Sequence, residues 1–125
     1  MRQLVFVVED DNTIRELVSQ ILEEDFHVFG FSNITAFEQC VRKIRPSLVL
    51  LDVNLPDGNG VEACRRLKKN ETFRETPVLL MSGDAVPSES LRRSGAESFI
   101  GKPFNLTDLK EMTQQYVASR VTVSR

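Results

Sequence analysis

The chain has 125 residues, of which 41% are hydrophobic and 27% charged, and this size and composition predict one soluble globular domain. A formal net charge of -2 creates no field that would attract nucleic acid or an anionic membrane, so neither is an expected partner. Apolar runs such as Leu48–Leu51 are far too short to cross a bilayer, and the first residues lead into a strand-like run rather than an export signal. We therefore expect a cytoplasmic protein.

Strand-like and helix-like segments alternate along the chain. The first apolar run, Leu4–Val8, precedes the cap candidates Asp11 and Asn12 and a predicted helix. The apolar face of that helix consists of Ile14, Leu17, Val18, Ile21 and Leu22. A second strand is predicted at His27–Phe31. The second helix ends before Pro46, and its apolar face consists of Ala36, Phe37, Cys40, Val41 and Ile44.

The remaining segments repeat this alternation. The third and fourth strands, Ser47–Val53 and Pro77–Met81, are apolar enough to be buried on both faces. Between them, a weaker helical pattern consists of Val61, Cys64 and Leu67. A short fourth helix is predicted between Pro87 and Gly95, because proline suits a first helical turn and glycine a C-cap. The fifth strand is Ser98–Ile100, and the fifth helix runs from the Asn105 cap through Leu109, Met112, Tyr116 and Val117.

Five such units in a chain of this length predict an α/β fold with a parallel sheet, because parallel strands need crossover helices and those crossovers are right-handed. The expected architecture is a three-layer, doubly wound (βα)5 flavodoxin-like fold with strand order 2-1-3-4-5. Strands one and three are then neighbours at the topological switch point. Ligands should bind at their carboxyl ends.

Acidic residues follow both of these strands. The first strand ends in Glu9, Asp10 and Asp11, and the third ends in Asp52. Asp11 is well placed to cap the first helix. Asp10 and Asp52, held close together, would repel each other unless they were protonated or bridged by a cation, and oxygen ligands suit Mg²⁺. The sequence therefore predicts a divalent metal site.

Two further polar residues are expected at the same edge of the sheet. Ser82 ends the fourth strand, and Lys102 follows the fifth. Lys102 alone can neutralise only part of the acidic cluster, but its flexible ammonium is suited to binding a phosphate.

Four motifs stand in order along the chain, each at the end of a predicted strand. They are VVEDD at Val7–Asp11, LLDVNLPDG at Leu50–Gly58, MSG at Met81–Gly83, and Gly95-Ala96 with FIGKPF at Phe99–Phe104. From Leu4 to about Val117 the chain resembles the receiver domain of two-component response regulators. The resemblance implies a phosphorylation-controlled signalling switch rather than an enzyme.

The same resemblance implies a role for the acidic residues. Asp52 would be the phosphoacceptor, which takes a phosphoryl group from a phosphohistidine on a sensor histidine kinase or a histidine phosphotransfer protein. Mg²⁺ (or Mn²⁺) would be held by Asp10, Asp52 and the backbone carbonyl of Asn54. Glu9 would either bind the metal directly or contact the residues and waters that bind it.

The resemblance also implies a switch. Lys102 and the Ser82 hydroxyl would bind phosphoryl oxygens, and the Phe99 ring would turn inward when Ser82 moves toward the phosphate. The peptide bond between Lys102 and Pro103 is expected in cis. Because the segment between Ser82 and Gly95 is shorter than is usual in receivers, the fourth helix is expected to be truncated.

Three other functions are weighed against this one. A haloacid-dehalogenase-like phosphatase also uses a strand-end aspartate with Mg²⁺, but it requires an acid where this chain has Asn54. A flavodoxin-like flavin carrier requires a hydroxyl- and glycine-rich phosphate loop where this chain has three acids. A degenerate receiver that acts only as a protein-interaction module is disfavoured, because the set of Glu9, Asp10, Asp52, Ser82 and Lys102 is intact.

The remaining polar and sulfur-containing residues are expected to be structural. Cys40 and Cys64 lie on separate helices and are interpreted as small buried hydrophobes rather than a disulfide. His27 is the sole histidine and is interpreted as structural. The basic residues of the third and fourth helices are expected to form solvated faces: Arg65, Arg66, Lys68, Lys69, Arg92 and Arg93.

Residues 1–117 are expected to form the receiver domain. Residues 118–125 are polar and lose the apolar helical pattern, as in a C-terminal tail or the start of a linker. A downstream effector protein and an output domain both stay open as further partners.

Overall fold

The computed structural model describes residues 2–123, including the side chains of residues 2–119. Its central sheet has five parallel strands in the order β2-β1-β3-β6-β7. These strands are β1 (Leu4–Val8), β2 (His27–Phe31), β3 (Leu48–Asp52), β6 (Val78–Ser82) and β7 (Ser98–Gly101). Numbered by their place among the five, they follow the predicted order 2-1-3-4-5, which is confirmed.

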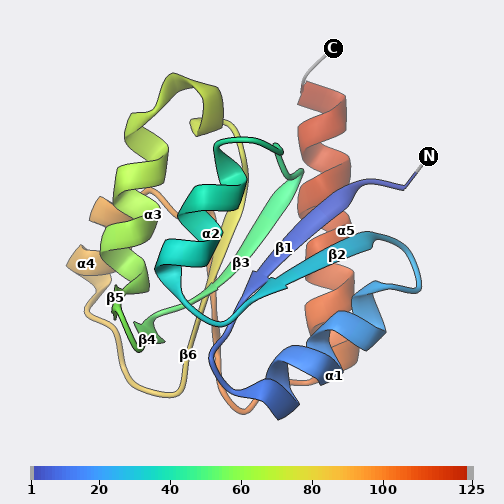
Figure 1. Cartoon of the computed structure of the whole chain (residues 1–125), viewed down its shortest axis with the longest axis horizontal. Helices are drawn as coiled ribbons and strands as arrows, with labels where there is room; N and C mark the ends of the chain where they lie inside the picture. Colours follow the sequence, from blue (N-terminus) through green and yellow to red (C-terminus); the bar gives the residue numbers. More distant parts are fainter. Residues whose placement is uncertain (1, 124–125) are drawn as a thin grey trace.

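Helices cover both faces of this sheet (Figure 1). One face is covered by α1 (Asn12–Leu22) and α5 (Leu106–Val123), and the other by α2 (Ile34–Val41), α3 (Gly60–Lys69) and α4 (Ser88–Ser94). Successive residues of a strand point to opposite faces, so each face has its own apolar core. Val5 and Val7 pack into the core beneath α1 and α5, whereas Phe6 and Val8 pack into the other.

The central strands and the helix ends follow local signals. β3 and β6 are buried along their whole length, as their apolar composition predicts. Asp11 accepts a hydrogen bond from the backbone N–H of Ile14 at 3.0 Å and so caps α1. The short α4 ends at Gly95, whose φ of 80° lies in the left-handed region that glycine adopts without strain.

Several features were not predicted. β4 (Asn54–Leu55), β5 (Gly58–Asn59) and the short 3-10 helix η1 (Glu71–Phe73) contain two or three residues each, too few for a periodic pattern. Helix α2 ends at Val41, so the assignment of Ile44 to its apolar face is wrong, and Ile44 is 43% exposed. Helix α5 continues to Val123, beyond the last residue of its apolar pattern.

The prediction of a solvated basic face is wrong for Lys68. The side chain of Lys68 is only 11% exposed, and its ammonium donates to the carboxylate of Glu97 at 2.7 Å. It also donates to the carbonyls of Thr76 at 2.6 Å and Arg74 at 3.2 Å. These acceptors lie after η1 and before β7, so no pattern within α3 could reveal them.

Of the two cysteines, Cys64 is buried as predicted, whereas Cys40 is only partly buried. Cys40 and Cys64 are free, and the Cys64 thiol donates to the carbonyl of Ser94 at 3.3 Å. Burial raises the pKa of Cys64 to about 12, so this thiol stays protonated at neutral pH. His27 is exposed on the edge strand β2.

Among residues 2–123, no helix combines the length and the apolar character that crossing a membrane would require.

Candidate phosphoacceptor and metal site

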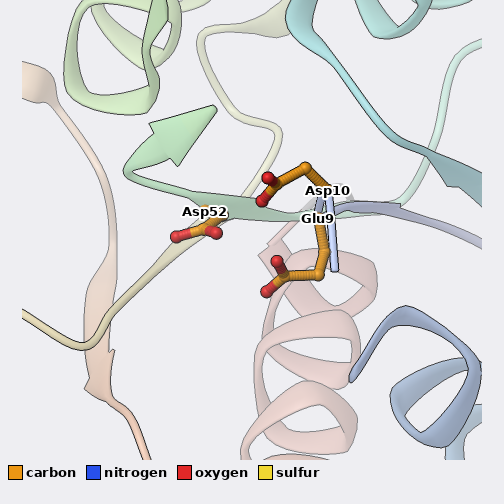
Figure 2. Close-up of side chains that lie close together, drawn as sticks. All are labelled: Glu9, Asp10 and Asp52. Carbon is orange, nitrogen blue, oxygen red and sulfur yellow. The ribbon is translucent and has the colours of Figure 1, made fainter. Parts of the chain in front are cut away.

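Three carboxylates meet where β1 and β3 end. Val8 lies opposite Leu51 in the parallel pairing of these strands, which brings together the residues that follow them on both strands. Glu9, Asp10 and Asp52 each place one carboxylate oxygen within 4.8 Å of the others, and their side chains project into one space (Figure 2). Glu9 and Asp52 are buried, whereas Asp10 is exposed.

Lys102 enters this cluster from the end of β7. Its backbone N–H donates to the carbonyl of Ser82 at 2.8 Å. Its ammonium donates to Glu9 Oε1 at 2.5 Å and to Asp52 Oδ2 at 3.1 Å. Burial alone would lower the pKa of Lys102, but its hydrogen bonds to Glu9 and Asp52 outweigh burial and raise it. The ammonium is therefore charged at neutral pH.

One ammonium faces three carboxylates, so the cluster retains excess negative potential. Burial raises the pKa of Glu9, and the nearby Asp52 carboxylate adds to this rise. Hydrogen bonds from Lys102 and from the backbone of Asp11 act in the opposite direction. An acidic, all-oxygen cluster with one exposed member suits a divalent cation, and Mg²⁺ prefers such ligands. The donor set therefore fits the predicted metal.

Asn54 and Ser82 border the same cluster. The backbone N–H of Asn54 donates to Asp52 Oδ1 at 3.3 Å, and its side-chain amide donates to Asp84 Oδ2 at 3.1 Å. The Ser82 hydroxyl accepts from the N–H of Asp84 and donates to the carbonyl of Asp84, both at 3.0 Å. Ser82 therefore turns toward its own loop in this structure. A groove of about 250 Å³ lies beside it, lined by Asn54, Ser82, Asp84 and their neighbours.

The other residues predicted for the switch lie on β7 and just after it. Phe99 is partly buried and packs against the core beneath α2, α3 and α4. The peptide bond between Lys102 and Pro103 is cis.

Sequence reasoning missed two residues that shape this edge. The Arg15 guanidinium donates to the backbone carbonyl of Glu9 at 2.7 Å and holds the acidic loop from α1. Gly60 is required by a close approach, because a Cβ there would lie 2.1 Å from the carbonyl oxygen of Asp52. The two glycines of the Gly58-Asn59-Gly60 run could have indicated a close approach of the backbone. The partner of Arg15 could not be predicted, because it depends on how α1 packs.

Comparison with known proteins agrees with this geometry. The family model described as the response regulator receiver domain matches residues 5–114. This chain belongs to the receiver domain family of response regulators. The receiver is 32% identical over 116 residues to the phosphate regulon transcriptional regulatory protein PhoB of Escherichia coli. It is 35% identical over 112 residues to the DNA-binding response regulator MtrA of Mycobacterium tuberculosis.

These alignments cover 87% of the receiver but only 49% of PhoB and 48% of MtrA. The chain thus spans about half the length of the curated relatives it matches.

Solved structures give the same family and fold. The receiver superposes on the BeF3-activated DrrB receiver domain with a TM-score of 0.85 and 30% identity, covering 94% of this chain and 99% of that one. A CheY-like response regulator receiver domain protein from Methanospirillum hungatei gives a TM-score of 0.91 and 25% identity, covering 98% of both chains. The predictions of a response regulator receiver and of the flavodoxin-like α/β fold are both confirmed.

Proposed function

We propose that this receiver accepts a phosphoryl group on Asp52 from a phosphohistidine of a sensor histidine kinase or a histidine phosphotransfer protein in the cytoplasm. The observation that carries the proposal is the setting of Asp52. Its carboxylate is buried, bonded to Lys102 at 3.1 Å, and grouped with the Glu9 and Asp10 carboxylates. This arrangement supplies a nucleophile and a cation, and retains the excess negative charge that a metal would balance.

In the proposed transfer, an oxygen of Asp52 attacks phosphorus and the phosphorus–nitrogen bond to the donor imidazole breaks. The bonding electrons return to the imidazole nitrogen, and the product is an aspartyl phosphate. Lys102 already donates to Asp52 and Glu9, so it is close enough to pair with a phosphoryl oxygen as negative charge arrives.

Glu9, Asp10, Asp52 and the backbone carbonyl of Asn54 would hold Mg²⁺ or Mn²⁺ beside the acceptor. When bound, such an ion neutralises negative charge on the phosphoryl oxygens and on the carboxylates. Asp10 is the exposed member of the acidic cluster, which leaves it open to a hydrated ion.

Ser82 and Phe99 would convert phosphorylation into a change of surface. The Ser82 hydroxyl now bonds to the backbone of Asp84, so reaching the phosphoryl group would require it to leave both of those bonds. Its departure would free space that the Phe99 ring can enter. Phosphorylation would shift the balance between two packings through these differential contacts. Hydrogen exchange of Gly83–Ser90 with and without beryllofluoride tests this step, and an unresponsive loop would contradict it.

The phosphohistidine partner would dock beside Lys102. An apolar groove lined by Ile14, Leu17, Pro103, Phe104 and Leu106 adjoins that lysine, and Leu17 is 46% exposed. A donor protein that covers this groove would place its histidine near the acceptor. Leu17→Glu should therefore slow transfer from the phosphorylated partner but not from acetyl phosphate. Ile44→Glu is the matched control, because Ile44 is similarly exposed and follows α2 rather than lining this groove.

The switch would act on a downstream effector protein or on an output domain. PhoB is named as a transcriptional regulatory protein and MtrA as a DNA-binding response regulator, and each extends well beyond the region matched here. We assign residues 1–117 to the receiver and residues 118–125 to a tail or to the start of a linker. In this assignment the receiver is a switch and not an enzyme, and it makes no direct contact with nucleic acid or membrane.

Intact-mass measurement tests the phosphoacceptor. In Mg²⁺ and acetyl phosphate, the wild-type chain should gain one phosphoryl group, and EDTA should prevent the gain. Asp52→Asn should not gain it under the same conditions. Undiminished incorporation in that variant would refute the assignment of Asp52. A wild type that takes up no phosphate despite intact folding would instead support the degenerate receiver, and turnover of phosphoesters would support the phosphatase.

A further inference from the structure

The short ribbon formed by β4 and β5 begins at the phosphoacceptor and ends at α3. Asn54 and Leu55 pair antiparallel with Asn59 and Gly58, so Pro56 and Asp57 form the connecting turn. At the base of the ribbon, the Gly60 N–H donates to the carbonyl of Val53 at 2.7 Å. This bond closes the loop at its base, whereas the tip is fixed by separate contacts.

The tip of the ribbon is bonded to the amino terminus of α2. Asp57 Oδ1 accepts from the backbone N–H of Ile34 at 2.8 Å. Asp57 Oδ2 accepts from the backbone N–H of Thr35 at 2.8 Å and from its hydroxyl at 2.7 Å. These contacts span 22 and 23 residues of sequence, so they join two segments that are separate along the chain.

The chemistry of this contact is complementary. The first amides of a helix have no partner within the helix and carry partial positive charge, so a carboxylate is a favourable acceptor there. Asn33 accepts from the N–H of Ala36 at 2.8 Å, so Asn33 and Asp57 together satisfy the first three amides of α2. Hydrogen bonds from Ile34 and Thr35 lower the pKa of Asp57, so its carboxylate is ionised at neutral pH.

The backbone also approaches α2 closely at this place. A Cβ at Gly58 would lie 3.0 Å from Ile34 Cδ1, so the ribbon packs against the helix as well as bonding to it. The tip of the ribbon is therefore fixed on α2, in addition to the bonds that Asn54 itself makes with Asp52 and Asp84.

We propose that Asp57 is a positioning residue for the metal and phosphoacceptor site, which acts by fixing the ribbon that carries Asn54. The inference rests on the proposed function, in which the Asn54 carbonyl is a metal ligand. A carbonyl contributes to metal binding only when it is oriented, and releasing the ribbon tip adds freedom that binding must then remove. Asp57 touches neither the acidic cluster nor the phosphoryl group in this scheme.

Calorimetric titration of the full chain with Mg²⁺ tests this inference. Asp57→Ala should bind Mg²⁺ roughly three- to tenfold more weakly than wild type. This loss of affinity is at or below the smallest that usually follows removal of a residue that supports a metal ligand. Asp57→Asn keeps one oxygen acceptor and should lie between the two. Asn33→Ala is the matched control, because it removes the other side-chain cap of α2 without touching the ribbon. It should lower the melting temperature as Asp57→Ala does, and leave Mg²⁺ affinity unchanged.

The outcomes separate the two proposals. Wild-type Mg²⁺ affinity in Asp57→Ala, with a loss of stability equal to that of Asn33→Ala, would reduce Asp57 to a helix cap and overturn the inference alone. Weaker binding in both variants would assign the effect to α2 as a whole and also overturn it. If Asp57→Ala does not fold, the affinity of Asp57→Asn decides. A wild type that neither binds Mg²⁺ nor takes a phosphoryl group would overturn the proposed function as well.

Discussion

Two lysines in ion pairs lie at opposite ends of the sheet, and their surroundings differ. Lys68 lies near the amino ends of β6 and β7, where it bonds to one carboxylate, Glu97, and two backbone carbonyls. Glu97 in turn accepts from the N–H of Val78 at 2.7 Å, so the charges there are matched and satisfied. Lys102 lies at the carboxyl ends, where it faces Glu9 and Asp52 with Asp10 beside them.

The difference teaches that the balance of charge, rather than burial, distinguishes this structural ion pair from the one that we propose to be reactive. A lysine whose charge is matched and whose hydrogen bonds are satisfied holds elements together and has no reason to change its partners. A lysine outnumbered by carboxylates leaves an excess of negative charge that a cation can neutralise. In the proposed transfer, its ammonium would change partner from a carboxylate to a phosphoryl oxygen.

The largest expected effect is on the rate of phosphorylation, which should depend on Lys102 and not on Lys68. Lys102→Ala should slow phosphorylation by acetyl phosphate by about a hundredfold, because a cation aimed at the transferred group is lost. Lys68→Ala should change that rate by less than about twofold when both are measured well below the melting temperature, since it lies at the other end of the sheet. Time courses of intact mass measure both rates, and equal slowing in the two variants would contradict the distinction.

A metal should stabilise the protein through the carboxylates around Lys102, where negative charge is in excess. With Mg²⁺ at about one hundred times its dissociation constant, the free energy of unfolding should rise by about 2.7 kcal/mol in the wild type. Asp10→Asn should lose most of that gain, because it removes one carboxylate from the cluster. Urea unfolding with Mg²⁺ or with EDTA measures the gain, and an undiminished gain in Asp10→Asn would place the ion elsewhere.

Mutation of Lys68, whose charge is matched by Glu97, should change the stability of the protein but not its phosphorylation. Lys68→Met keeps the apolar stem but leaves Glu97 and two carbonyls without this donor, so the free energy of unfolding should fall by about 2 kcal/mol. Arg66→Met is the matched control on the same helix. Its pair with Glu38 is more exposed and should contribute no more than about 0.5 kcal/mol. Equal losses would show that the buried setting of Lys68 adds nothing.

At neutral pH the smallest effect is that of the Cys64 thiol, which lies beside Lys68 and Glu97 and whose influence on stability changes only at alkaline pH. The ordinary pKa of a cysteine is 9.0, whereas burial raises that of Cys64 to about 12. Between these values the unfolded chain loses the proton that the native chain keeps. The contribution of Cys64 to stability is therefore complete below pH 9 and declines as pH rises toward 12. Urea unfolding should show stability falling faster with pH in the wild type than in Cys64→Ala, and parallel curves would contradict the shift.

The sequence by itself determined the fold, because alternating apolar runs and amphipathic stretches are local properties of the chain. The β1, β3 and β6 segments are apolar enough to lie inside the sheet, and helix starts such as Asp11 depend on atoms only a few residues away. The parallel topology then brings the carboxyl ends of β1 and β3 together, so the meeting of Glu9, Asp10 and Asp52 was predictable without coordinates.

Only the tertiary structure decided which polar side chains find distant partners. Lys68 looked like a surface lysine because its three acceptors lie outside α3. The contact of Asp57 was not predicted, because its donors on α2 lie 22 and 23 residues earlier in the chain. The hydrophobic pattern specifies which face of an element is buried, but it does not specify the loop backbone that ends up beside it. Hydrogen bonds depend on placement within a few tenths of an ångström, and such placement exists only after the layers have packed.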